Sequence, residues 1–120
     1  MTGLDKESVL RYRKTVQSLV PRFVPAGKSV DGVLEELAEK WNPLFDSRQR
    51  QDLVEDVNAL VRDFLRPLRQ SFVQRCPDPD RIRGLAEQLS RSGSLARIAK
   101  KDALVRYLEL YVVRCLDTMK

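Results

Sequence analysis

The sequence contains no histidine, and this absence removes the most common general base and the most common metal ligand of proteins. Only two cysteines are present, Cys76 and Cys115, so a tetrahedral zinc site lacks ligands. Five glycines are scattered without the spacing of a phosphate-binding loop. The residue types that make most enzymes recognisable are therefore missing, and we predict neither a catalytic residue nor a cofactor.

Long apolar runs are also absent, since no stretch approaches the roughly 18 residues that a membrane-spanning helix needs. The first residues, MTGLDKESVL, lack the basic and then apolar order of a secretion signal. We therefore expect a cytoplasmic protein in which both cysteines are reduced. A length of 120 residues is typical of one domain, and residues 1–120 are predicted to form it.

What the sequence does contain is apolar residues at intervals of three and four, separated by proline and glycine breaks. The intervals predict helices over residues 5–20, 30–41, 48–75 and 95–118, and a short fourth helix capped by Asp80. No run alternates in the manner of a strand. We predict an all-α bundle of four to five helices, with Trp41, Leu44 and Phe45 closing one end of the core.

The segment ALVRDFLRPLRQSF, residues 59–72, carries a proline that opposes helix formation. Its apolar stripe includes Phe64, Leu68 and Phe72, and the spacing continues across Pro67 without a shift. Two independent helices would usually reset that spacing. We therefore predict one long third helix, kinked near Pro67, where the proline nitrogen cannot donate to the carbonyl of Asp63.

The last segment is apolar on nearly all sides, because Tyr107, Leu110 and Val113 fall outside its main stripe. A helix of this kind is either central in its bundle or shared with another subunit. The central position is the expectation for the fold. The three residues also mark a candidate partner surface, if they form an exposed apolar patch on the outer side of the helix.

Three arginines, Arg62, Arg66 and Arg69, align on the back of the third segment. A solvated helix face explains such a ridge. A contact with a phosphate backbone or an acidic protein is the functional alternative. The charge is also segregated, because residues 25–60 are net acidic while residues 1–24 and 61–101 are net basic. These basic flanks support nucleic-acid binding as the alternative function.

Two acidic stretches, EELAE at residues 35–39 and DLVED at residues 52–56, lie on neighbouring predicted helices. Together they resemble the all-α nucleoside triphosphate pyrophosphatases, which hold magnesium with an EExxE stretch and an ExxD pair. Glu35, Glu36 and Glu39 match the first motif, whereas Asp52 and Glu55 reverse the second. The resemblance implies a magnesium-dependent enzyme. This is the least favoured hypothesis, because the glutamates project away from the predicted core.

The sequence thus favours a non-catalytic helical module that binds a protein partner or a second copy of itself, or a small subunit of an assembly. Its predicted contacts are Tyr107, Leu110 and Val113 on the last helix and the arginine ridge of Arg62, Arg66 and Arg69.

Overall fold

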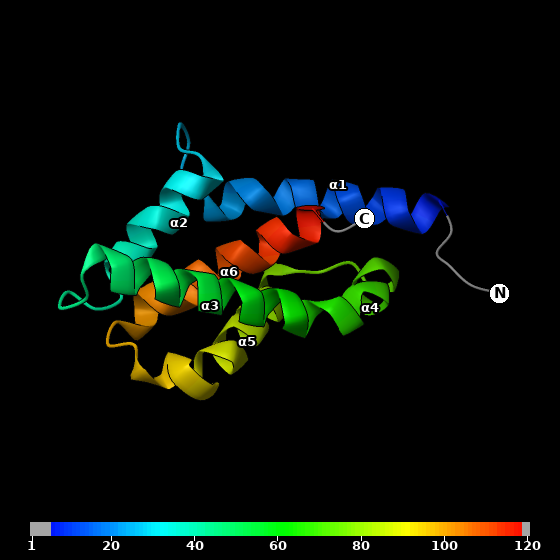
Figure 1. Ribbon diagram of the computed structural model, residues 1–120. Coiled ribbons are helices and arrows are strands. Elements are labelled where there is room, and N and C mark those ends of the chain that lie inside the picture. The colour runs from blue at the N-terminus through cyan, green and yellow to red at the C-terminus, as the bar shows by residue number, and fades with distance from the viewer. Residues whose placement is uncertain (1–5, 119–120) are drawn as a thin grey trace.

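The computed structural model describes residues 6–118, with the backbone alone at positions 94 and 97, and this part of the chain is helical without any strand (Figure 1). The helices are α1 (Lys6–Phe23), α2 (Val30–Glu39), α3 (Ser47–Leu65), α4 (Arg69–Gln74), α5 (Pro79–Ser90) and α6 (Lys101–Thr118), with short 3-10 turns η1 (Arg66–Leu68) and η2 (Gly93–Arg97). The all-α prediction is confirmed. None of the described helices is long and apolar enough to cross a membrane.

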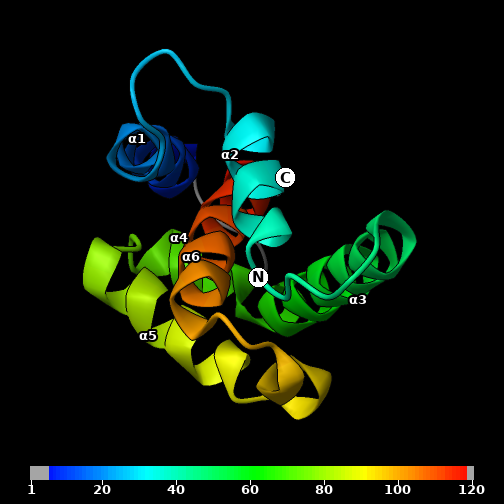
Figure 2. The ribbon, with the colours of Figure 1, turned by 90° about the vertical axis from the view of Figure 1, so that its left-hand side faces the viewer.

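Helix α6 lies in the middle of the bundle, as predicted. Helices α1, α2, α3 and α5 all pack against it and surround it (Figures 1 and 2). Its side chains are buried from Ala103 to Leu116 with few interruptions, such as Arg106 and Arg114. A helix that is apolar on nearly all sides is stable only where neighbours cover every side, so the other helices are arranged around α6.

This arrangement corrects one expectation. Tyr107, Leu110 and Val113 are 2%, 1% and 0% exposed, so they form no apolar patch on the outside of α6. Leu110 and Val113 line a small cavity of about 260 Å³ together with Val20 of α1 and Val30 of α2, and both of these helices pack on α6. The exposed apolar patch expected at these three residues is therefore absent, because the chain's own helices pack around this part of α6.

The chain passes Pro67 without reversing, so the predicted kinked helix is present. Helix α3 ends at Leu65, the 3-10 turn η1 contains the proline, and α4 continues the helical path. The amide of Arg69 bonds to the carbonyl of Arg66, which is the tighter 3-10 pattern. A proline lacks the amide hydrogen that an α-helical turn requires here, and the local change to 3-10 geometry accommodates it.

The helix ends agree with the sequence in part. Ser29 and Asp46 cap α2 and α3, and Asp46 forms a reciprocal capping box with Gln49. Helix α5 is capped by Asp78 rather than Asp80, because Pro79 takes the first helical position, which suits a residue without an amide hydrogen. The last helix begins at Lys101 instead of residue 95, since η2 precedes it.

The turn between α2 and α3 agrees with the prediction only in part. Trp41 is fully buried and closes the core and Phe45 is half-buried, whereas Leu44 is 95% exposed. Leu44 therefore provides a reference site for an apolar side chain that contributes little to folding.

We expect Leu110→Ala to lower the free energy of unfolding by about 2–5 kcal/mol, because it leaves a cavity between α6 and its neighbours. Leu44→Ala is the control and should change stability by less than about 0.5 kcal/mol, since this side chain is in solvent. Urea denaturation followed by circular dichroism measures both. Equal effects of the two variants would contradict the central position of α6.

Candidate functional site

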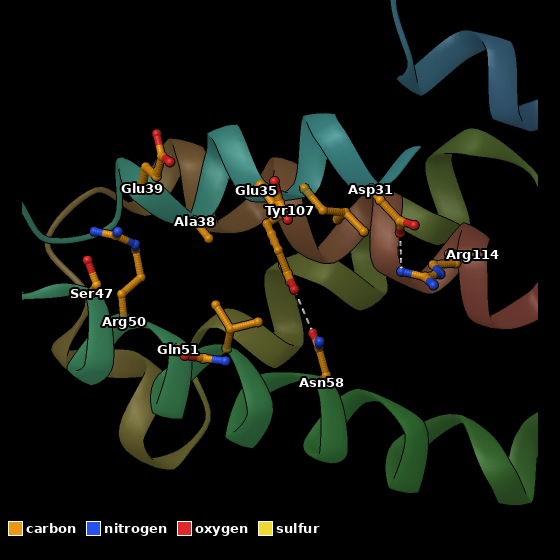
Figure 3. Close-up of a pocket in the computed structure, with 12 residues that line it drawn as sticks. Asp31, Glu35, Ala38, Glu39, Ser47, Arg50, Gln51, Asn58, Tyr107 and Arg114 are labelled. Carbon is orange, nitrogen blue, oxygen red and sulfur yellow. Dashed lines mark hydrogen bonds and ion pairs between the residues drawn. The ribbon is translucent and has the colours of Figure 1, made fainter. Parts of the chain in front are cut away.

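A groove of about 560 Å³ lies between α2 and α3 (Figure 3). Both helices pack on α6, but they diverge from one another, as Figure 2 shows. The side chains of Leu34, Ala38, Val54 and Tyr107 supply its apolar surface. The volume is within the range of about 300–1,000 Å³ that is usual for ligand-binding clefts, so we treat the groove as the candidate functional site.

Tyr107 of α6 lies at the base of the groove and is held on both sides of its ring. The edge of Trp41 approaches it with ring centroids 4.7 Å apart at 74°, and Tyr111 stacks on it at 6.0 Å. Its hydroxyl donates a hydrogen bond of 2.6 Å to Oδ1 of Asn58 on α3. Burial raises the pKa of Tyr107 to about 12, although the bond to Asn58 opposes this. The phenol is therefore neutral at physiological pH.

One helical turn further, the same two helices are joined again. Nη1 of Arg62 on α3 donates a bond of 2.8 Å to the hydroxyl of Tyr111 on α6. Asn58 and Arg62 are four residues apart, as are Tyr107 and Tyr111, so the two bonds form a regular ladder between α3 and α6. This ladder fixes the position of the α3 wall of the groove.

The predicted arginine ridge is divided among three environments. Arg62 is bound to α6, while Arg66 is exposed and makes a long ion pair of 3.5 Å with Asp63. Arg69 is partly buried beside Tyr12 of α1, and its Nε has no hydrogen-bond partner among the described residues. The three guanidinium groups therefore do not act as one uniform surface.

The two walls of the groove differ in chemistry. Asp31, Glu35 and Glu39 follow one another at four-residue intervals along the α2 wall. The α3 wall carries mainly uncharged polar groups, among them Gln51 and Asn58, and one cation, Arg50. Arg114 of α6 forms an ion pair with Asp31 across one end of the groove (Figure 3).

The motif that resembles the pyrophosphatases is not assembled in this structure. Glu36 points away from the groove and pairs with Lys28 at 3.1 Å. Asp52 and Glu55 are exposed and do not line the groove, so they do not face Glu35 and Glu39. Among the described residues, no group of three His, Cys, Asp or Glu side chains is placed to hold a metal ion.

Sequence reasoning missed Asn58, Gln51 and Arg50, which line the groove. The only available signal was the polar Asn58 beside the apolar stripe of α3, four residues before Arg62. A pattern of this kind is common on solvated helices and does not indicate a groove. The divergence of α2 from α3 makes these residues neighbours, and it has no signature in the sequence.

Comparison with known proteins adds no relative: no family model, no curated protein and no solved structure matches this chain. The fold and the groove consequently define it only as an all-α helical bundle.

Removal of the Tyr107 hydroxyl tests the ladder. Tyr107→Phe should lower the free energy of unfolding by about 1 kcal/mol, because Asn58 is left without its partner. A double-mutant cycle with Asn58→Ala, measured by urea denaturation, isolates the bond from other effects of either change. The two substitutions should be coupled, and strict additivity would show that the bond contributes nothing.

Outside the groove, Glu109 of α6 is a buried carboxylate, 7% exposed. Its Oε1 lies 3.3 Å from Nη1 of Arg83 on α5, and Arg83 also pairs with Glu87 at 3.2 Å. Burial raises the pKa of Glu109 above its ordinary value of 4.5. The positive charges of Arg83 and Arg106 oppose this rise, and the negative charge of Glu87 adds to it.

Because the folded protein binds the Glu109 proton more tightly than the unfolded chain, its contribution to stability is largest below the unfolded pKa. That contribution is lost as pH rises through the folded pKa. We expect Glu109→Gln to remove this loss, so that its stability relative to wild type increases as pH rises above about 4. Urea denaturation at a series of pH values measures the difference. Glu55→Gln, which changes an exposed carboxylate of α3, is the control, and an identical pH profile for both variants would contradict the assignment.

Proposed function

We propose that this protein is a non-catalytic helical interaction module that holds a segment of a partner protein in the groove between α2 and α3. The observation that carries the proposal is the groove itself, with an apolar floor, an acidic α2 wall and a mainly uncharged polar α3 wall. Interfaces commonly combine an apolar centre, which contributes binding energy, with a polar rim, which contributes orientation. The contact predicted on α6 is replaced by this groove.

The dimensions of the groove suit a short peptide segment. Asp31, Glu35 and Glu39 span two helical turns, or about 12 Å at a rise of 1.5 Å per residue. Two turns of a helix or about four extended residues cover that length. The carboxylate row favours a segment whose basic side chains lie toward α2. Opposite charges on the groove and on the bound segment steer association and fix the direction of the segment.

The chemistry of the groove supports binding rather than catalysis. The chain has no histidine, and Tyr107 holds its proton up to about pH 12. The thiol of Cys115 is buried, and burial raises its pKa, which lowers its reactivity. We also propose a cytoplasmic location, which is supported by the free thiols of Cys76 and Cys115, a state typical of a reducing compartment.

Obstruction of the groove tests the proposal. Gln51 is exposed on the α3 wall, so Gln51→Trp should fill the groove without removing a core contact. Gln88→Trp adds the same side chain on the exposed face of α5 and serves as the matched control. Affinity capture from native lysate should recover one partner with wild type and with Gln88→Trp, and at least about tenfold less with Gln51→Trp.

Crosslinking locates the contact independently. A photoreactive phenylalanine analogue at position 51 should attach to the captured partner, whereas the same analogue at position 88 should not. Equal recovery with both tryptophan variants, or crosslinks only from position 88, would show that the groove is not the contact surface. Crosslinks to a second copy of the chain would identify the partner as the protein itself.

A further inference from the structure

Two basic segments that are far apart in the sequence lie side by side in the fold. Helix α1 packs against α4 at the end of the molecule opposite the start of α3 (Figure 1). Arg13 of α1 and Arg69 of α4 both lie close enough to the hydroxyl of Tyr12 that their charges lower its pKa, against the larger effect of burial. The fold therefore brings the basic flanks of the sequence together at one place.

This basic end, defined as α1 together with residues 61–76, concentrates the positive charge of the chain. Helix α1 carries five cations and one carboxylate, and residues 61–76 carry four arginines and one aspartate. Asp117, near Tyr12, is a further carboxylate at this end. Since the net charge of the whole chain is only +5, the remainder of the protein is net negative.

Most of these cations are not neutralised within the protein. Arg11, Arg13 and Lys14 are exposed and form no ion pair with the other described residues. Arg66 has only the long, exposed pair with Asp63, which contributes little energy. Positive charges clustered without partners raise the local potential and attract anions over about 10 Å.

The apolar content of this end indicates the kind of anion. Leu10, 57% exposed, is the large aliphatic side chain that α1 presents to solvent among the described residues. A folded protein partner would normally require an apolar centre, and a membrane would require several apolar anchors. A phosphate backbone requires only cations, and arginine matches phosphate with paired donors.

We propose that the basic end binds the phosphate backbone of double-stranded nucleic acid without reading the base sequence. The rings of Tyr12 and Phe72 are buried, and the partly buried rings of Phe23 and Phe64 pack against the core. None of these rings is therefore free to stack on the bases of a single strand. Helix α6 is buried as well and cannot enter a groove of the duplex as a recognition helix. The site does not involve the α2–α3 groove, so the two proposals can fail separately.

The test is fluorescence anisotropy with the full chain and a labelled DNA duplex of about 20 base pairs of arbitrary sequence, between about 50 and about 200 mM salt. The variant Arg11→Gln, Lys14→Gln and Arg66→Gln removes three exposed cations from the basic end. Its affinity should fall on the order of tenfold. A plot of the logarithm of the association constant against the logarithm of the salt concentration should become less steep. Its slope should decrease in magnitude by about 0.9 for each phosphate that the variant no longer neutralises.

The matched control removes three exposed cations from the opposite end, with Lys40→Gln, Arg48→Gln and Lys100→Gln. The control variant lowers the net charge by the same amount as the first variant. Its affinity and its salt slope should stay closer to those of wild type than the values of the first variant do. Circular dichroism verifies that both variants fold. Any of three results would overturn the proposal. These are an equal drop in affinity for both variants, no binding of the duplex by wild type at about 50 mM salt, and binding only to vesicles of phosphatidylcholine and phosphatidylserine.

Discussion

The burial of α6 on every side is the constraint on which the rest of this structure depends. Its apolar side chains cannot be covered by one neighbour, so α1, α2, α3 and α5 are all arranged around it. Burial on this scale is the dominant favourable term in folding. It also obliges the polar groups of α6 to find partners, because an unpaired buried polar group is costly. Tyr107, Tyr111 and Glu109 each meet this requirement with a residue of another helix.

The groove follows from the same constraint. Helices α2 and α3 are both held by α6, and the ladder of Asn58 and Arg62 to the two tyrosines fixes where α3 lies. The two helices need not meet along their length when a third helix supports them both. The space left between them has core residues at its base and polar residues along its walls, and clefts between helices are a usual place for binding sites.

The charges of the molecule are separated along with its surfaces. Carboxylates of α2 line one wall of the groove, while the cations of α1 and of residues 61–76 gather at the basic end. The two surfaces of opposite charge are built from different elements around the same core, so the two proposals made for them are independent of one another.

The all-α class, the kinked path through Pro67 and the central last helix could all be predicted from the sequence. They follow from the intervals between apolar residues and from the chemistry of proline, which are local properties of the chain. The direction that each face of a buried helix takes toward its neighbours is not a local property of the chain. Tyr107, Leu110 and Val113 are therefore buried instead of forming the expected exposed patch. Nothing in the sequence indicated that Asn58 and Gln51 line a groove. Only tertiary packing, which sets the angle between α2 and α3, decided that the groove exists and that the basic flanks meet.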